Sequence, residues 1–172
     1  MTSSTGSKEF RERQRRLTLA KVTAHEGDWF AVPLRAGGFA AGVVARANPR
    51  GVMFGYFFGP KRTEVPALED VTSLTPADAV LVGKFGDLGL LRGTWPVLGP
   101  GPHWDRGRWP MPPLIRYEEL TGRSFRVYYA DDDPNELIRE EQVPPGETED
   151  GPEDGLMGAG FVEKRLTRLL GD

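Results

Sequence analysis

The stretch GDWFAVPLRAGGFAAGVVARANPRGVMFGYFF, residues 27–58, contains three runs of apolar, β-branched and aromatic residues separated by turn-forming residues. The runs cover residues 29–34, 39–45 and 52–58, and each follows a turn signal that contains glycine or proline. The connections between them are only a few residues long, which is the spacing of antiparallel hairpins. The stretch therefore predicts three consecutive antiparallel strands.

Three further runs of strand-forming residues follow at residues 79–85, 88–97 and 125–129, each bounded by Gly, Pro or Asp. Six short strands with brief connections predict a mainly β (α+β) protein, built on a single antiparallel, strongly curved sheet or a small barrel. Short helices are expected at residues 75–79, where threonine precedes proline, and at residues 117–121, which end at a glycine.

The end of the sequence is typical of an amphipathic helix. Apolar residues recur there at helical spacing, with charged residues on the opposite side and Gly171 as a stop signal; they are Phe161, Val162, Leu166, Leu169 and Leu170. We therefore expect a C-terminal helix over residues 159–172 that packs on the sheet.

The formal net charge of −3 averages three zones of different sign. Residues 1–21 carry six basic and two acidic side chains, whereas residues 131–154 carry eleven acidic side chains and one basic side chain. The rest of the chain has a small excess of positive charge. This uneven distribution indicates a protein that binds a charged partner.

The length of 172 residues fits one domain with flexible charged tails. We expect a basic N-terminal arm over residues 1–21, flexible or partly helical, and a β-rich domain over residues 22–139. Residues 140–158 alternate acidic residues with Pro and Gly, so they bury too little apolar surface to offset the entropy of ordering. They are expected to form a disordered segment before the C-terminal helix.

The sequence has no cysteine, which excludes disulfides, iron–sulfur clusters and thiol nucleophiles. No window approaches 18 consecutive apolar residues, and the first thirty residues lack the pattern of a signal peptide. We therefore expect a cytoplasmic protein without a membrane-spanning segment.

Catalytic and ligand-binding motifs are scarce. The chain has two histidines, His25 and His103, and no Gly-x-Ser-x-Gly motif accompanies them. Residues 131–136 resemble the start of a calcium loop, but Glu136 stands where an EF-hand needs Gly, and Gln142 where it needs a bidentate Glu. The sequence therefore predicts no catalytic residue, no cofactor and no metal site. A small hydrolase that uses one of the two histidines stays as a third class of function.

Nucleic-acid binding is the alternative that the residues themselves allow. Six arginines are interspersed with aromatic residues in the middle of the chain, a mixture that can stack bases and hold phosphates; they are Arg92, Arg106, Arg108, Arg116, Arg123 and Arg126. The basic arm would attract a polyanion, whereas the acidic zone after residue 130 would repel it. A nucleic-acid-binding β-barrel module therefore stays open.

The most unusual part of the chain is the Pro- and Trp-rich stretch over residues 95–116. Tryptophans are seldom left in a structureless linker, so the stretch predicts a long ordered loop. Trp95 and Trp109 are expected to cover the sheet, while Trp104, next to Asp105 and Arg106, is expected to be partly exposed. Exposed aromatic residues beside arginine are typical of protein-interface anchors.

The order of these segments resembles a family of bacterial toxin-neutralising proteins, the immunity protein 26 type. The resemblance is carried by residues 27–34, 37–46 and 55–58 and by four later segments; these are Val82-Gly-Lys-Phe-Gly-Asp-Leu-Gly-Leu90, Gly93-Thr-Trp-Pro-Val97, the block from Trp104-Asp-Arg to Trp109-Pro-Met-Pro, and the ending around Val162-Glu163. It implies a non-enzymatic, β-rich protein that protects its own cell by binding a toxin of a polymorphic toxin system. The basic arm and the acidic segment lie outside the pattern.

A toxin that attacks nucleic acid is expected to have a cationic cleft, which an acidic surface can occupy. We therefore predict that an acidic cluster and an aromatic anchor contact the toxin; the candidate residues are Trp104, Asp105, Arg106, Arg108, Asp131, Asp132, Asp133 and Glu136. The expected partner is the cognate toxin protein, with no membrane and with nucleic acid only as the alternative. The sequence does not indicate an oligomeric state.

Overall fold

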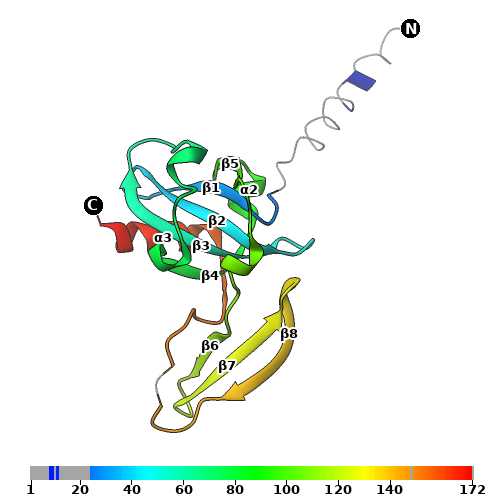
Figure 1. Cartoon of the computed structure of the whole chain (residues 1–172), viewed down its shortest axis with the longest axis vertical. Coiled ribbons are helices and arrows are strands. Elements are labelled where there is room, and N and C mark those ends of the chain that lie inside the picture. The colour runs from blue at the N-terminus through cyan, green and yellow to red at the C-terminus, as the bar shows by residue number, and fades with distance from the viewer. Residues whose placement is uncertain (1–7, 10, 12–23, 148, 172) are drawn as a thin grey trace.

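The computed structural model describes residues 8, 9, 11, 24–147 and 149–171, and Figure 1 shows two β-sheets of unequal size. The larger, sheet A, has six strands in the order β5-β1-β2-β3-β4-β9, and the smaller, sheet B, has three in the order β6-β7-β8. Neighbouring strands are antiparallel, except for the parallel pair β4 and β9. Most of the expected basic arm lies outside the described residues.

Sheet A is built mainly from the apolar runs near the start of the domain. Its strands are β1 (Asp28–Pro33), β2 (Phe39–Ala47), β3 (Val52–Arg62), β4 (Leu81–Gly86), β5 (Val97–Pro100) and β9 (Leu156–Met157). Gly37 and Gly38 turn the chain between β1 and β2 at positive φ, a conformation that glycine adopts without strain. The strands predicted over residues 29–34, 39–45, 52–58 and 79–85 are confirmed, with ends that differ by a few residues.

Both faces of sheet A are buried, because apolar residues occupy successive positions of its central strands. On one face, Phe30, Phe57 and Phe85 surround the fully buried Trp95. Phe30 stacks on the Trp95 indole, with ring centroids 5.7 Å apart and an interplanar angle of 9°. Burying each of these large side chains contributes about 1.5–3 kcal/mol to folding.

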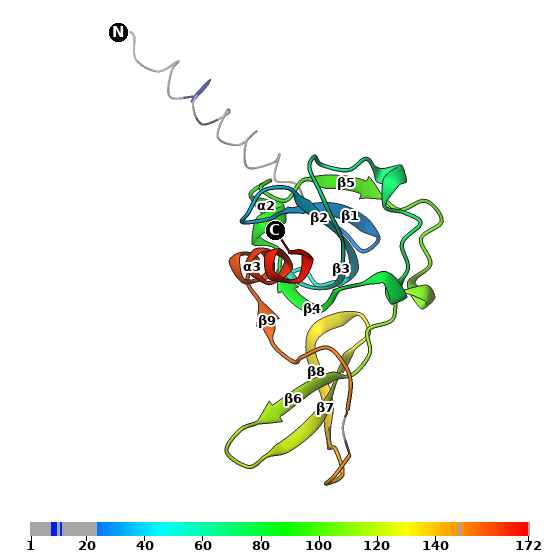
Figure 2. The same ribbon diagram turned by 90° about the vertical axis from the view of Figure 1, so that its left-hand side faces the viewer.

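Two helices cover this first face. The single turn α2 (Leu88–Leu91) buries Leu90 beside the aromatic cluster, and α3 (Ala159–Leu170) inserts Val162 and Leu166. Figure 2 shows α3 against the curved sheet, close to β4. The predicted C-terminal amphipathic helix is therefore confirmed.

Long connections with three single 3-10 turns cover the second face. The turns are η1 (Leu68–Asp70), η2 (Pro76–Asp78) and η3 (Arg106–Arg108). Trp109, from the Pro- and Trp-rich loop, packs edge-on against Trp29, with ring centroids 5.7 Å apart. The loop is ordered as predicted, and Trp95 and Trp109 are both buried as expected.

Sheet B consists of β6 (Leu114–Glu118), β7 (Arg123–Ala130) and β8 (Asp133–Gln142). Figures 1 and 2 both show it projecting away from sheet A. Leu114, at the start of β6, is fully buried in the cluster on the second face of sheet A. The strand predicted over residues 125–129 lies within β7.

The structure is mainly β, as predicted, but the prediction of a single antiparallel sheet or a small barrel is wrong. The described residues form two separate sheets, and neither closes into a barrel. Sheet A is mixed because the chain, after leaving sheet B, returns along the edge of β4 in the same direction before it enters α3.

Three local predictions also differ from the structure. Residues 88–97 were expected as a strand, but they begin with α2, because an apolar run alone does not distinguish a strand from a buried helical turn. The helix expected at residues 117–121 is instead the end of β6 and its turn into β7. Within the segment expected to be disordered, residues 140–142 pair with β7 and residues 156–157 pair with β4, so backbone hydrogen bonds order parts of it despite its polarity.

Candidate functional site

The loop that carries Trp104 and Arg106 is held in place by two hydrogen bonds. An Asp105 carboxylate oxygen accepts a hydrogen bond from the Gly107 amide at 3.0 Å, which closes the η3 turn. The buried Tyr56 hydroxyl donates to the Pro110 carbonyl at the other end of the loop, and burial raises the pKa of Tyr56 to about 12. Asp105 is therefore a loop-positioning residue in this structure.

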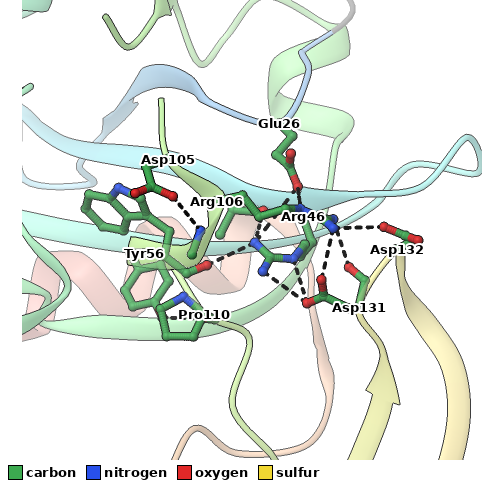
Figure 3. Close-up of polar contacts among 11 residues, drawn as sticks. Glu26, Arg46, Tyr56, Asp105, Arg106, Pro110, Asp131 and Asp132 are labelled. Atoms are coloured by element: carbon green, nitrogen blue, oxygen red, sulfur yellow. Dashed lines mark hydrogen bonds and ion pairs between the residues drawn. The ribbon is translucent and has the colours of Figure 1, made fainter. Parts of the chain in front are cut away.

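Arg106 is the centre of a charged network that joins the loop to the turn between β7 and β8 (Figure 3). Its Nε lies 2.8 Å from Glu26 Oε1, and its Nη1 donates to Asp131 Oδ2 and Asp132 Oδ1 at 2.9 Å each. Its Nη2 also donates to the Asp131 carbonyl oxygen at 3.0 Å. The hydrogen bond to Glu26 is the main cause that raises the pKa of Arg106, so this guanidinium stays charged.

A second arginine, which the sequence analysis did not select, shares Asp131. The Arg46 side chain is only 4% exposed, and its Nη2 lies 3.0 Å from Asp131 Oδ1. Its Nη1 donates to the carbonyl oxygens of Trp109 and Ala45. A β-bulge between Val44 and Arg46 places Arg46 opposite Phe54, whose side chain lies on the second face, and so directs the guanidinium toward sheet B.

Asp133 has a structural partner as well. The Asn48 amide nitrogen donates to Asp133 Oδ1 at 2.9 Å, and the Asn135 amide donates to the same oxygen. These hydrogen bonds, that of Asn48 first, lower the pKa of Asp133. Asp131, Asp132 and Asp133 thus all bind cationic or amide groups of their own chain, although the Asp132 side chain is 89% exposed.

Trp104 is half-buried and stacks on Trp109, with ring centroids 5.9 Å apart and an interplanar angle of 14°. Gly27 lies so close to its ring that a Cβ there would be 3.0 Å from the indole. The indole nitrogen of Trp104 is buried and has no hydrogen-bond partner among the described residues. Trp104 is therefore held rigidly, with one polar group unused.

A cavity of about 480 Å³ opens beside this tryptophan pair. Trp29, Trp104, Asp105, Arg108 and residues 72–76 line it. Arg108 is exposed, and within the described part of the chain it makes no ion pair. A preformed cavity with aromatic walls and a free cation can accept one side chain of a protein partner.

The same cavity includes Ser73 and His103, which bears on the hydrolase alternative. No hydrogen bond joins Ser73, His103 and Asp105 to one another in the described structure, whereas a hydrolytic triad requires such contacts. The described residues also contain no group of three or more His, Asp or Glu side chains that could hold a metal ion. In the same part of the chain, no helix is long and apolar enough to span a membrane.

A separate polar cluster joins the two sheets at β4. Lys84 Nζ lies 3.6 Å from Asp154 Oδ1 and 3.8 Å from the centre of the Tyr129 ring. The Tyr129 hydroxyl donates to Asp154 Oδ1 at 2.7 Å. Burial lowers the pKa of Lys84, and the Asp154 carboxylate opposes that effect.

Several arginines proposed for nucleic-acid binding have acidic neighbours. Arg116 pairs with Glu140 at 3.1 Å, and Arg126 makes a bidentate contact with Glu149, whose pKa it lowers. A phosphate would have to compete with these carboxylates. The arrangement does not favour the nucleic-acid alternative.

The structure thus brings Arg106, Asp131 and Asp132 together. It places Trp104, Asp105 and Arg108 around the neighbouring cavity. Asp133 is hydrogen-bonded to Asn48 instead. Glu136 is exposed on β8, and its side chain makes no hydrogen bond or ion pair with another described residue. Glu26, Arg46 and Asn48 are residues of the network that sequence reasoning missed. A signal existed for Arg46, because it is a single cation inside the apolar run of β2.

The comparison with known families explains which part of this architecture is shared. The sequence model of the family described as Immunity protein 26 matches residues 25–126, from just before β1 to the middle of β7. No curated protein and no solved structure gives a significant match to the chain. The matched region covers more than half of the chain and contains Glu26, Arg46 and the whole loop around Trp104. The chain therefore belongs to the Immunity protein 26 family.

Proposed function

We propose that this protein is a non-enzymatic, cytoplasmic immunity protein that binds and neutralises a toxin of a bacterial polymorphic toxin system. The observation that carries the proposal is the family match over residues 25–126. The rigid loop, the cavity beside Trp104 and the exposed carboxylates near it supply a surface suited to binding a protein.

The proposed contact surface combines an aromatic anchor with a small number of free charges. Trp104 is immobilised by stacking on Trp109, so little side-chain entropy is lost when a partner packs on it. The exposed Arg108 guanidinium offers hydrogen-bond donors at the cavity. Central aromatic and arginine residues of this kind carry most of the binding energy in many interfaces.

The acidic part of the surface is smaller than the sequence indicates. Asp131 and Asp133 are already hydrogen-bonded within the chain, and Asp132 accepts from Arg106 although its side chain is 89% exposed, so the carboxylates that a cationic toxin surface can reach are those of Glu136 and the exposed Asp132. Exposed charges at the rim of an interface mainly accelerate association, and salt weakens that effect. We therefore assign Trp104 to affinity, and Asp132 and Glu136 to the association rate.

The test is binding to the toxin encoded next to this gene, together with protection of cells that express the toxin. Trp104→Ala is expected to weaken binding at least about tenfold, the size of a typical aromatic hot spot. The Asp132→Ser, Glu136→Ser double variant is expected to lower the association rate at low salt by about two- to tenfold. Glu64→Ser, which removes an exposed carboxylate on another loop, is the control.

Absence of both binding and protection for the unaltered protein would overturn the proposal. Protection that survives Trp104→Ala with unchanged affinity would instead move the contact surface elsewhere. This design avoids substituting Asp131 and Asp133, whose loss would also disturb the connection between the sheets.

A further inference from the structure

The outer edge of β8 is an uncovered strand edge in the described structure. Sheet B has two outer strands, β6 and β8. The edge of β6 is covered, because Ile115 donates to the Pro152 carbonyl and accepts from the Asp154 amide, both at 2.8 Å. Strand β8 pairs only with β7, so its other edge offers backbone groups to an incoming strand.

The hydrogen bonds of β8 show which backbone groups face outward. The Val143 amide donates to the Ser124 carbonyl at 2.8 Å, next to the pair formed by Phe125 and Gln142. Hydrogen-bonded and non-hydrogen-bonded pairs alternate in an antiparallel ladder. The N–H and C=O groups of Glu140 and Gln142 therefore point away from β7.

The side chains along this edge combine apolar surface with negative charge. Leu137 and Ile138 are 53% and 58% exposed and adjacent, beside a β-bulge. Glu136 is next to them in the strand and makes no ion pair with a described residue, whereas Glu140 and Glu141 pair with Arg116 and Arg126, and Arg139 is the one basic residue of the strand. Natural edge strands are usually short or carry lysine, whereas β8 is 10 residues long and exposes two aliphatic side chains.

We propose that β8 binds an extended basic segment of the partner toxin by strand addition. The segment would pair with the outward groups of Glu140 and Gln142, a basic side chain of it would face Glu136, and an apolar side chain would cover Leu137 and Ile138. A second copy of this chain is a poor occupant, because antiparallel pairing of two β8 strands would bring acidic side chains together.

The position of β8 relative to the family match gives this surface a specific role. The match ends at residue 126, inside β7, so β8 lies wholly outside the part shared with the family. The loop around Trp104 is inside it. The inference rests on the proposed function and adds to it that β8 selects which toxin is bound.

The decisive comparison is Glu140→Pro against Glu140→Ala, measured as affinity for the toxin. Both variants lose the ion pair with Arg116, but only proline removes the outward N–H, a change that edge strands tolerate. Glu140→Pro is expected to bind at least about tenfold more weakly than Glu140→Ala. Circular dichroism and thermal unfolding establish that both variants are folded.

Hydrogen exchange of the unaltered protein supplies a measurement that needs no variant. The amides of Glu140 and Gln142 are expected to exchange at least about tenfold more slowly in the toxin complex than in the free protein. Glu136→Lys is expected to weaken binding at low salt, whereas Glu64→Lys is not.

The outcomes separate the two proposals. No binding by the unaltered protein contradicts the proposed function itself. Binding with equal affinity for Glu140→Pro and Glu140→Ala, or with unchanged exchange at Glu140 and Gln142, overturns strand addition while leaving the proposed function in place. If the free protein self-associates and Glu140→Pro abolishes that self-association, the occupant of the β8 edge is a second copy of the chain. This result would also overturn the inference.

Discussion

The Arg46 guanidinium on β2 lies 3.0 Å from the carboxylate of Asp131, which follows β7, and this pair joins the two sheets. Its two members are in unequal environments, because Arg46 is 4% exposed and Asp131 is 62% exposed. Arg46 also donates hydrogen bonds to the carbonyl oxygens of Trp109 and Ala45, whereas Asp131 faces water on one side.

We predict that Arg46→Met and Asp131→Asn differ strongly in stability. Arg46→Met leaves two buried carbonyl groups without a donor and should lower the free energy of unfolding by about 3 kcal/mol. Asp131→Asn should lower it by less than about 1 kcal/mol, because Asp131 is largely hydrated. Urea denaturation followed by tryptophan fluorescence measures both; equal losses would show that Arg46 is not structurally dominant.

Gly89→Ala should destabilise the protein although alanine favours helices. A Cβ at Gly89 would lie 2.6 Å from the Trp95 ring, which is fixed between Phe30 and Phe85. The expected loss is about 1–3 kcal/mol, the usual range for overpacking a core. Gly86→Ala is the matched control, since nothing lies within 4 Å of its Cβ position; thermal unfolding of the two variants should differ clearly.

Acid should remove the stabilisation that Asp133 provides. Its pKa is lower in the folded protein than in the unfolded chain, so its contribution is complete above a pH of about 4 and is lost as the pH falls through the folded pKa. Asp133→Asn should therefore be less stable than the unaltered protein at pH 7, with a smaller difference at pH 3. Urea midpoints at the two pH values test this, and a difference independent of pH would contradict it.

Tyr129→Phe should cost more stability than Tyr128→Phe. The Tyr129 hydroxyl donates to Asp154 at 2.7 Å in the half-buried cluster with Lys84, whereas Tyr128 contacts Glu141 on the exposed surface at 3.2 Å. We expect a loss of about 1 kcal/mol for Tyr129→Phe and much less for Tyr128→Phe. Parallel chemical denaturation of the two variants decides the point, and similar losses would exclude a special role for the Lys84 cluster.

The strands of sheet A were predictable because their residues carry the signal themselves. The run before Pro33 and the run after Gly38 are apolar, and the glycines between them adopt the positive φ that the turn requires. By contrast, β8 was missed because its side chains are exposed and mostly charged. Its conformation depends on backbone pairing with β7, which leaves no hydrophobic pattern in the sequence.

The candidate site was predictable in composition but not in pairing. The sequence identifies Arg106 and the three aspartates after Ala130 as charged groups, yet it does not show that Arg106 meets Asp131 across 25 residues of chain while Asp133 binds Asn48. Arg46 lies further away still, and a bulge decides the direction of its side chain. Which of the predicted carboxylates pair with groups of the same chain, and which do not, therefore became known only from the three-dimensional structure.

Residues 130–156 contribute no side chain to either hydrophobic cluster of the described structure, although they include all of β8. Substitutions on β8 consequently leave the aromatic packing that stabilises the fold untouched. Apart from Asp133, which holds Asn48, and the buried Pro134, the protein can thus accumulate sequence change on this strand under natural selection at little cost in folding free energy. Such mutational tolerance would let the strand follow changes in a partner's sequence while the rest of the chain remains constant.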